Sequence, residues 1–358
     1  MQNGNIKFFS KGEEGRIASF FQDTMNWPGF DHAGEAEDHW RWKYLSRPKN
    51  GFVSCAAWDG DRVVSHAASL DTDIFIDGTV WKGGQWTDLY TRQEYRGRGL
   101  ADAVARCLEE RLVEQGVDIE IAFPSLAGQE VIQKRGFEEL NVPFVQFEIV
   151  TNPSSFFGND PLGTVKKLAY ESFQAIRTPN LIIGSGLVEE VDTFSEDVEG
   201  LVRRFEGMFD IAVHKSPEYL NWRYTEPTGG RFRVLLAAKG DRTVGFAVLR
   251  PYANGGSTYM DIVDCMVDLE DDQVPRVLLA EAVELARREG VDAMQVWLPS
   301  DHPLRPYLNK SGFLNRSPRP EEREFKVMFR VSDGQELRRT LSRPGLRAHI
   351  MLGDSDWV

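Results

Sequence analysis

The six residues Arg96-Gly97-Arg98-Gly99-Leu100-Ala101 lie between a strand-like run that ends at Thr91 and a strongly helical stretch. Glycine adopts backbone conformations that side chains obstruct, and it lets a ligand approach the main chain closely. A helix start leaves several N–H groups without a partner inside the helix, at the positive end of the peptide dipoles. Strand, glycine-rich turn and helix N-terminus therefore predict a site for a phosphate or pyrophosphate. Arg96 and Arg98 add charge that pairs with phosphate oxygens.

Two common phosphate motifs do not fit this stretch. The P-loop spacing G-x-x-x-x-G-K-[S/T] is absent, and the dinucleotide fingerprint needs Gly or Ala where this chain has Asp102. Through Arg96, Gly99 and Ala101 the stretch instead matches Arg/Gln-x-x-Gly-x-Gly/Ala. With Tyr95 ahead and an amphipathic helix behind, it resembles the acetyl-coenzyme A (acetyl-CoA) loop of the GNAT (Gcn5-related) N-acetyltransferases. A plain strand–turn–helix connection is the alternative interpretation of the same glycines.

Length and composition are those of an ordinary soluble protein. The 358 residues allow two domains with full cores, and 41% are hydrophobic and 27% charged. No apolar run is long enough for a membrane span, and the first ten residues lack the layout of a signal peptide. We therefore expect a cytoplasmic protein that does not bind membranes. The net charge of −13 disfavours nucleic acid as a partner and is compatible with a cationic amine substrate.

Cysteine and histidine usage predicts no metal site. Cys55, Cys107 and Cys265 are too few and too scattered for a disulfide framework or a CxxC motif. Cys107 falls on the apolar face of the helix after the loop, so we expect it in the core. The six histidines do not have the spacing of metal ligands.

An internal repeat predicts the architecture. Four short motifs recur in the same order 174 to 180 residues later: Trp42-Lys43-Tyr44 as Trp222-Arg223-Tyr224, Gly60-Asp61-Arg62 as Gly240-Asp241-Arg242, Gly116-Val117-Asp118 as Gly290-Val291-Asp292, and Arg135-Gly136-Phe137 as Ser311-Gly312-Phe313. Ordered matches of this kind indicate a tandem duplication.

Each copy has the same order of predicted elements. A helical segment comes first, over Glu13–Met25 or Glu196–Met208, and an aromatic-rich stretch follows. Short strands separated by turn pairs predict an antiparallel meander, and a helix followed directly by an apolar strand predicts a parallel crossover. In the first copy these are strands at Phe52–Trp58, Arg62–Ser69 and Thr79–Thr91, a helix from Leu100 to Gly116, and a strand at Ile119–Phe123. The second copy supplies a helix at Val274–Glu289 and a strand at Ala293–Leu298.

This order also matches the GNAT fold, so the resemblance covers roughly residues 5–150. It implies an α+β protein of two tandem GNAT-like domains, each a mixed, mostly antiparallel sheet flanked by helices. We expect a GNAT domain over 1–150, a linker with a helix over 151–189, a degenerate GNAT-like domain over 190–330 and a tail over 331–358. In the second copy the loop is replaced by Val267-Asp268-Leu269-Glu270-Asp271-Asp272. Four carboxylates with no cation among them would repel a pyrophosphate, so we expect this domain to be a lid or one wall of the acceptor cleft.

The resemblance implies how the cofactor is held. Backbone N–H groups of Asp88-Leu89-Tyr90-Thr91 would hold the pantetheine arm and the thioester oxygen, where oriented donors stabilise a developing oxyanion. The residues Arg96, Gly97, Arg98, Gly99, Leu100 and Ala101 would bind the pyrophosphate through main-chain donors. The Ser125 hydroxyl is a further candidate contact to coenzyme A, or it is a helix N-cap.

Catalytic groups are harder to assign. Family members often carry a tyrosine acid four residues before the terminal Gly-Phe, where this chain has Ile132. Ser125 retains a hydroxyl nearby, and a thiolate, with a thiol pKa of roughly 8.5, can leave without an acid. Candidates for the base are Asp88 and Glu120, although Glu120 fits equally well on the polar face of a half-buried strand. The terminal carboxylate of Val358 is a further candidate, because some tandem GNAT enzymes bring theirs into the active site.

The resemblance therefore implies an acetyl-CoA-dependent N-acetyltransferase that acts on a primary amine of a small molecule, such as an amino sugar or polyamine. A non-catalytic acyl-CoA binder with a regulatory or scaffolding role is the main alternative, and Ile132 favours it. A nucleotide-binding protein is the third.

Overall fold

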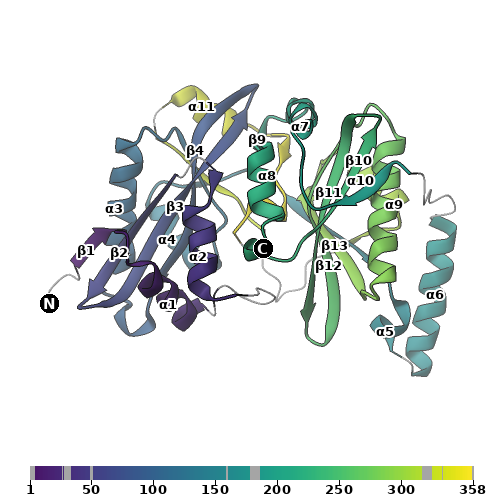
Figure 1. The fold of residues 1–358 in the computed structure, drawn as a ribbon, viewed down its shortest axis with the longest axis horizontal. Coiled ribbons are helices and arrows are strands. Elements are labelled where there is room, and N and C mark those ends of the chain that lie inside the picture. The colour runs from purple at the N-terminus through teal and green to yellow at the C-terminus, as the bar shows by residue number, and fades with distance from the viewer. Residues whose placement is uncertain are drawn as a thin grey trace.

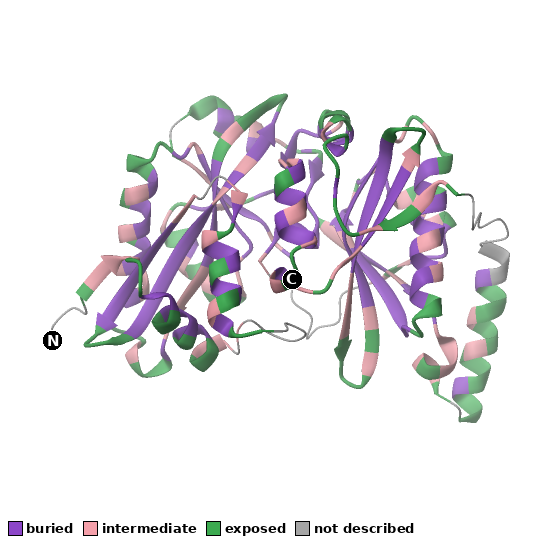
Figure 2. Ribbon diagram, in the orientation of Figure 1, coloured by how far each residue is buried: buried purple, intermediate pink, exposed green. Residues whose placement is uncertain are grey.

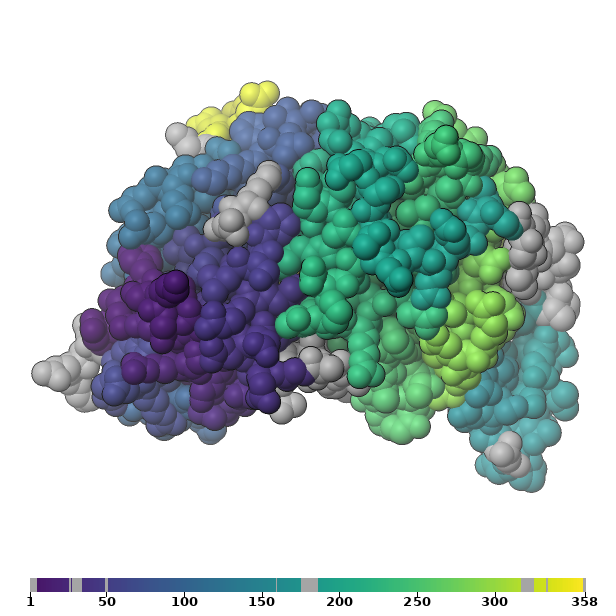
Figure 3. Space-filling view, viewed as in Figure 1, coloured from purple at the N-terminus to yellow at the C-terminus, as the bar shows by residue number. Residues whose placement is uncertain are grey.

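The computed structural model describes residues 5–25, 27, 34–48, 51–158, 160–177, 186–316, 325–332 and 334–356. Two mixed, mostly antiparallel sheets lie side by side with helices against them, so the predicted α+β fold class is confirmed (Figure 1). The strands are largely buried (Figure 2). The two halves of the chain pack against each other along a continuous boundary (Figure 3). No helix in these ranges is long and apolar enough to cross a bilayer.

The helices agree closely with those predicted. Among the predicted helices, α1 spans Glu14–Met25, α3 Leu100–Glu114, α6 Pro161–Arg177, α7 Val198–Glu206 and α9 Gln273–Arg288. The others are α2 (Ala36–Leu45), α4 (Leu126–Lys134), α5 (Pro153–Phe157), α8 (Pro217–Tyr224), α10 (Arg305–Lys310) and α11 (Gln335–Leu341). In Figure 1, α3 and α9 lie against the outer sides of the two sheets, and α2 and α8 lie between them.

The first sheet has the order β1-β2-β3-β4-β5-β15-β6, and β4 and β5 pair in parallel. Its strands are β1 (Asn5–Phe8), β2 (Phe52–Asp59), β3 (Arg62–Ile76), β4 (Thr79–Thr91), β5 (Ile119–Ala122), β15 (Met328–Val331) and β6 (Glu138–Glu139). Two short strands, β9 (Ile211–Val213) and β16 (Ala348–His349), extend it from β3.

The second sheet has the order β14-β7-β13-β12-β11-β10-β8, and β12 and β13 pair in parallel. Its strands are β14 (Leu314–Arg316), β7 (Phe144–Val150), β13 (Ala293–Pro299), β12 (Ser257–Val267), β11 (Arg242–Asn254), β10 (Arg233–Lys239) and β8 (Val188–Val191). The two halves thus repeat one topology, a meander followed by a helix and a parallel strand.

One feature of the sheets was not predicted. Strand β7 comes from the first half but lies between β13 and β14 of the second sheet. Strand β15 comes from the second half and lies between β5 and β6 of the first sheet. The expected boundary at residue 150 is therefore the end of a strand that completes the other sheet. Arg330 lies in this inserted strand.

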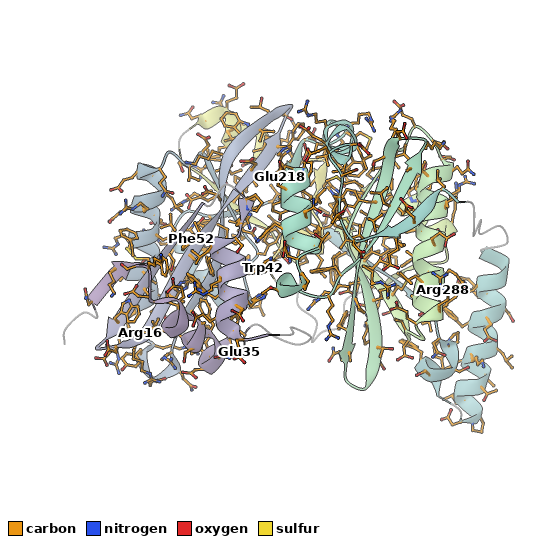
Figure 4. All side chains as sticks on the ribbon, viewed as in Figure 1. Arg16, Glu35, Trp42, Phe52, Glu218 and Arg288 are labelled. Atoms are coloured by element: carbon orange, nitrogen blue, oxygen red, sulfur yellow. A yellow bond between two sulfur atoms is a disulfide. The ribbon has the colours of Figure 1, made fainter. Side chains whose placement is uncertain are left out.

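The repeated Trp-Lys/Arg-Tyr motif forms the contact between α2 and α8. The rings of Trp42 and Trp222 stack with centroids 4.9 Å apart and planes inclined by 14°. Each indole Nε1 donates to the main-chain oxygen of the other tryptophan, at 3.0 Å in both directions. The two halves therefore meet in a nearly two-fold symmetric arrangement, with Trp42 on α2 facing α8 (Figure 4).

A disulfide contradicts one expectation. Cys55 on β2 and Cys107 on α3 are bonded to each other across 52 residues of chain, while Cys265 is buried and free. Cys107 packs beside the core as expected, but its bonding was missed because two distant cysteines carry no pairing signal in sequence. Such bonds are rare in reducing compartments, and the cytoplasmic location stays a prediction.

The tryptophan stack generates a stability prediction. Trp42→Ala or Trp222→Ala should each lower the free energy of unfolding by about 3 kcal/mol, since each removes a large buried ring. The double variant should lose at least about 1 kcal/mol less than the sum, because both changes remove the same contact. Chemical denaturation of the four proteins measures this coupling. Trp58→Ala, which lies outside the stack against Lys7, should combine additively with Trp42→Ala; equal coupling in both cycles would contradict the stack's role.

Candidate active site

A cavity opens where β4 and β5 separate. The two strands pair in parallel from Gly83 with Ile119 to Trp86 with Ala122. Beyond Trp86 they diverge around a cavity of about 350 Å³. Its walls are formed by the end of α1, the next residues of β4, the segment after β5 and the tail: Thr24, Met25, Trp86, Thr87, Asp88, Leu89, Tyr90, Ala122, Phe123, Pro124, Ser125, Gly128, Ile132 and Asp356.

Strand β4 has a bulge where it borders this cavity. Asp88 has a φ of 52°, and the register between β3 and β4 shifts opposite it. The buried His66 ring supports the bulge, because its Nδ1 lies 3.0 Å from the Asp88 carbonyl oxygen and its Nε2 lies 2.8 Å from Ser54 Oγ. A carbonyl can only accept, so Nδ1 carries the hydrogen and Nε2 accepts from the serine. Burial lowers the pKa of His66 to about 4, which keeps the ring neutral.

The predicted base Asp88 lies in the cavity wall with its carboxylate already engaged. Lys43 Nζ lies 2.8 Å from Asp88 Oδ2, and the Tyr44 hydroxyl donates to the same oxygen. Burial opposes ionisation of Asp88, but the Lys43 charge and the two hydrogen bonds outweigh it and hold the pKa of Asp88 below its ordinary value. Asp88 is therefore an ion-paired carboxylate with reduced affinity for a proton.

The two glycines of the loop before α3 lie in the left-handed region of the backbone. Gly97 and Gly99 have φ values of 74° and 75°, and Gly99 is the N-cap of α3. The Arg96 guanidinium lies over the Tyr90 ring and bonds its hydroxyl, while Arg98 bonds the Glu94 carbonyl. A second cavity, of about 450 Å³, borders Arg98, Gly99 and Leu100 at the start of α3. Leu89, Tyr90 and Thr91 of β4 lead into this loop from the first cavity.

Of the two alternatives for Ser125, the helix N-cap is observed, and the contact to coenzyme A stays a prediction. Ser125 is the N-cap of α4, where its Oγ accepts from Gly128 N at 3.2 Å. It also lines the first cavity. Ile132, at the position where family members often carry tyrosine, forms an apolar part of the same wall.

Glu120 does not lie in this cavity, which argues against it as a base. Its carboxylate is fully buried and bonded by Trp86 Nε1 at 2.5 Å and by Arg330 at 2.7 to 2.9 Å. Burial raises the pKa of Glu120, and the charge of Arg330 opposes that shift. Because Arg330 belongs to the inserted strand β15, this ion pair helps to hold β15 of the second half beside β5 of the first sheet. All four residues of β5 are buried, so alternation along it did not mark a solvated face.

The C-terminal tail reaches the first cavity. Asp356 lines it, accepts a hydrogen bond from the Thr87 hydroxyl, and lies 3.6 Å from Lys43 Nζ. Gln85 Nε2 donates to the Asp354 carbonyl at 3.1 Å. Val358, the residue predicted to supply a terminal carboxylate, lies outside the described residues. Sequence reasoning missed Asp356, Thr87 and Lys43, and the proposal of a terminal carboxylate at Val358 was the one inference that pointed toward this end of the chain.

The second half holds this tail in place. Arg223 donates to the main-chain oxygens of Gly353 and Ser355, each at 3.3 Å. Lys215 is fully buried and lies 2.8 Å from Asp264 and 2.9 Å from Asp354. Burial would lower the pKa of Lys215, but these two carboxylates outweigh it and raise that pKa. The tail is thus fixed by a buried ion pair and two main-chain hydrogen bonds.

The tail also fills the place in the second half that corresponds to the first cavity. Strands β12 and β13 pair from Tyr259 to Ile262 and then separate, and the short helix at Leu352–Asp354 contacts both. A Cβ on Gly353 would lie 2.2 Å from the Tyr224 hydroxyl. That hydroxyl donates to Asp264 at 2.9 Å, as Tyr44 does to Asp88.

The loop of the second half departs from the expectation in one respect. It was expected to have no cation near its carboxylates, and this is wrong. Arg242 pairs with Asp268, Lys239 with Asp271 and Arg276 with Asp272. These cations come from β11, β10 and α9, so the residues adjacent to the loop in sequence did not reveal them. Three of the four carboxylates of the loop are thereby ion-paired within the protein.

Comparison with known proteins agrees with this architecture. Residues 6–140 match the family model of the acetyltransferase (GNAT) domain. Similar solved structures include a GCN5-related N-acetyltransferase from Anabaena variabilis ATCC 29413, at 14% identity and a TM-score of 0.64 over 92% of this chain and 73% of that chain. Eis1 from Mycobacterium abscessus has 17% identity and a TM-score of 0.57 over 92% and 74%.

N-myristoyltransferase from Saccharomyces cerevisiae, solved with bound myristoyl-CoA, has 10% identity and a TM-score of 0.58 over 92% of this chain and 79% of that chain. At such identities the likeness concerns the fold. A search of curated proteins finds no match. The fold is that of GNAT acyltransferases, which carry out acyl transfer.

The neutral His66 beneath the bulge predicts a pH dependence. Its folded-state pKa of about 4 lies below the ordinary 6.5, so its contribution to stability is complete above about pH 6.5 and is lost as pH falls toward 4. His66→Gln keeps a donor and an acceptor but does not titrate. Between pH 7 and pH 5 the parent should lose about 2 kcal/mol more unfolding free energy than the variant. Denaturant titrations at both pH values test this, and identical losses would contradict a buried neutral imidazole.

Proposed function

We propose that the chain is an acetyl-CoA-dependent N-acetyltransferase with one working site, in its first half, that acetylates a primary amine of a small molecule. One observation carries the proposal. Tyr90 lines the cavity between the diverging strands β4 and β5, and its hydroxyl is bonded by Arg96 of the glycine-rich loop that leads into α3, a helix of 15 residues. A thioester arm and a diphosphate need these two features next to each other.

The cofactor fits this arrangement by its charge and shape. The diphosphate would bind the N–H groups at Gly97 to Ala101, where the helix dipole favours an anion, and Arg96 and Arg98 flank them. The pantetheine arm would follow Leu89, Tyr90 and Thr91, and the acetyl group would reach the cavity of about 350 Å³. The Ser125 hydroxyl borders the same path.

The reaction needs one proton acceptor close to the thioester. The amine nitrogen attacks the acetyl carbonyl, the C–N bond forms, the C–S bond breaks, and the amine loses a proton. Asp356 fits this role better than Asp88, because Asp88 accepts hydrogen bonds from Lys43 and Tyr44, whereas Asp356 accepts one from the Thr87 hydroxyl and lies further from Lys43 Nζ, at 3.6 Å. The terminal carboxylate of Val358 stays a candidate two residues further along.

No tyrosine acid is needed for the leaving group. Ile132 cannot donate a proton, but a thiol with a pKa of roughly 8.5 leaves as a thiolate and takes its proton from water. Main-chain N–H groups of the bulge, rather than an acid, would then supply most of the stabilisation of the transition state.

The second half fits a structural role. Its loop carries four carboxylates, of which three are ion-paired within the protein, and the chain's own tail lies where a thioester arm would bind. We therefore propose a tandem arrangement in which one domain binds the cofactor and the other holds the tail and borders the acceptor.

A non-catalytic acyl-CoA binder is the second candidate, and the ion-paired Asp88 together with Ile132 favours it. Release of free thiol from acetyl-CoA distinguishes the two candidates. An enzyme releases the thiol of coenzyme A when a suitable amine is present. A non-catalytic binder is stabilised against heating by acetyl-CoA but releases no thiol. Neither requires a metal.

Gly99 provides a test of the cofactor loop. Gly99→Asp places a carboxylate at the proposed diphosphate site and should weaken acetyl-CoA binding at least about tenfold through charge repulsion. Isothermal titration or thermal shift with acetyl-CoA measures it. Gly116→Asp is the matched control, because Gly116 follows the other end of α3 with a φ of 65° and open space around its Cα. Equal weakening by both variants, or none by Gly99→Asp, would overturn the cofactor site.

Asp356 provides a test of the chemistry. Asp356→Asn should lower kcat about 100-fold, the usual scale for loss of a proton acceptor, and leave the acetyl-CoA dissociation constant nearly unchanged. Removal of residues 357 and 358 should then have a smaller effect than Asp356→Asn. Asp301→Asn, an exposed substitution, controls for charge alone. A larger loss from the truncation would assign the role to Val358 instead.

A further inference from the structure

A cavity separate from the proposed cofactor site lies where the two halves meet. Its volume is about 430 Å³, within the range of small-molecule binding sites. One side is formed by the segment after α2 and by β3 and β4 of the first half, and the other by the segment from β9 into α8 of the second half. Strand β9 pairs with the end of β3, so these elements lie side by side (Figure 1). A ligand in this cavity would contact both halves.

Arg47 is a buried cation in the wall of this cavity, and it forms no ion pair with a carboxylate among the described residues. Its exposed fraction is 3%. Its Nε donates to the Asp71 carbonyl at 2.7 Å and its Nη2 to Thr72 Oγ1 at 2.9 Å, which leaves Nη1 without a hydrogen bond to the described part of the chain. The guanidinium lies 4.6 Å from the centroid of the Trp222 ring. Burial, with the nearby charge of Arg223, lowers the pKa of Arg47, so an anion beside it would favour the charged form.

Two further donors border the cavity. Trp81 Nε1 is buried and makes no hydrogen bond to the described residues, and the Tyr219 hydroxyl has no partner among them either. Tyr219 is 9% exposed, and its ring centroid lies 5.4 Å from the Arg47 guanidinium. A buried donor without an acceptor is unfavourable. Arg47, Trp81 and Tyr219 together therefore favour a ligand with acceptor oxygens, such as a carboxylate.

Acidic side chains border the same cavity, and they favour a zwitterion over a simple anion. The Arg, Lys and Asp side chains in its wall are Arg47, Lys82, Asp71 and Asp73. The two carboxylates would repel a simple anion such as phosphate, and the buried guanidinium would repel a simple amine. A molecule with a carboxylate at one end and an ammonium group at the other is attracted by both kinds of charge. Val80 and Trp81 add apolar surface beside them.

We propose that this cavity binds an α-amino acid with an apolar side chain. Its carboxylate would accept hydrogen bonds from Arg47 Nη1 and the Tyr219 hydroxyl, the first of which is charge-assisted. Its ammonium group would face Asp71 and Asp73, since a carboxylate accepts several hydrogen bonds. Its side chain would lie against the Trp81 ring. Because Arg47 belongs to the first half and Tyr219 to the second, the bound amino acid would join the two halves.

Distance separates this site from the acyl-transfer cavity. The two cavities have no wall residue in common in the described part of the chain. Trp81 and Asp88, one in each wall, are seven residues apart on β4, which is about 23 Å at roughly 3.3 Å per residue. Gln85 lies between them and donates to the Asp354 carbonyl of the tail at 3.1 Å. One amino acid cannot span this distance, so it would be a second ligand and not the acceptor.

Isothermal titration of the full chain with L-leucine, L-valine and L-phenylalanine tests the proposal. At least one should bind with a dissociation constant below about 1 mM. For an amino acid that binds, the matching acid without the amino group and the matching amine without the carboxylate should each bind at least about tenfold more weakly, because each loses one charged contact. For leucine these analogues are 4-methylpentanoate and 3-methylbutylamine. No binding by any of the three amino acids, or equal binding by either analogue, overturns the proposal.

Substitutions in the wall test where the amino acid binds. Tyr219→Phe keeps the ring beside Arg47 but removes the hydroxyl, and it should raise the dissociation constant about fivefold. Arg47→Gln should raise it at least about 30-fold, because the charge-assisted contact is lost. Tyr252→Phe, which removes a hydroxyl bonded to Asp261 on the second sheet, is the matched control and should bind as the parent does. Equal loss in both tyrosine variants, or unchanged binding by Tyr219→Phe, overturns the site even if Arg47→Gln fails to fold.

Two further measurements separate this proposal from the proposed function. Gly99→Asp, which should weaken acetyl-CoA binding, should leave amino-acid binding unchanged, so the amino-acid site stands or falls without the cofactor site. The amino acid that binds should also release no free thiol from acetyl-CoA. Thiol release that depends on this amino acid and is abolished by Tyr219→Phe or Arg47→Gln would make it the acceptor and overturn a separate ligand site.

Discussion

The stack of Trp42 on Trp222 is the contact on which the arrangement of the two halves depends. Each indole donates to the backbone of the other at 3.0 Å, so the end of α2 and the end of α8 are fixed relative to each other. The two residues that follow each tryptophan are positioned by the same contact. Lys43 and Tyr44 bond Asp88 at the bulge of β4, while Arg223 holds the tail and Tyr224 bonds Asp264. A three-residue motif, used twice, therefore links the interface between halves to the walls of both strand openings.

In both halves two parallel strands separate, but the space between them is a cavity in the first half and is filled by the tail in the second. In the first, β4 and β5 diverge around a cavity, and Asp356 enters it from one side. In the second, the tail itself occupies the space, and the buried Lys215 lies between Asp264 and Asp354, 2.8 and 2.9 Å from their carboxylates. Burying such charged groups costs more than leaving them in water unless their geometry is close. The short distances meet that condition, and removing Lys215 would leave both buried carboxylates without their cation. The filled opening is thus a rigid support for the tail.

Local patterns in the sequence predicted the helices and strands. They did not predict contacts between residues that are far apart in the chain. The four-residue spacing of Leu100, Val104, Leu108 and Leu112 predicted α3, and the turn glycines predicted the meander, because both signals lie within a few residues. The alternation of apolar and polar residues in β7 is the same whichever sheet the strand joins, so its pairing with β13 could not be predicted from the sequence. Glu120 had the sequence of an exposed position, and its partner Arg330 lies 210 residues away. The tail was proposed from the sequence through the terminal carboxylate of Val358, but the role of Arg223 and Lys215 in holding it could be seen only in the folded chain.

The exchange of strands explains why the second half matters to the first whether or not it binds a ligand. Strand β15 lies between β5 and β6, so the sheet that carries the cofactor cavity is incomplete without residues from the far end of the chain. Trp86 donates a hydrogen bond to Glu120 at the point where β4 and β5 begin to separate, and Arg330 of β15 donates to the same carboxylate. The opening therefore begins at a residue whose partner is supplied by the other half. Loss of a phosphate loop would not remove these contributions, because they depend on strand pairing and buried charge rather than on ligand binding.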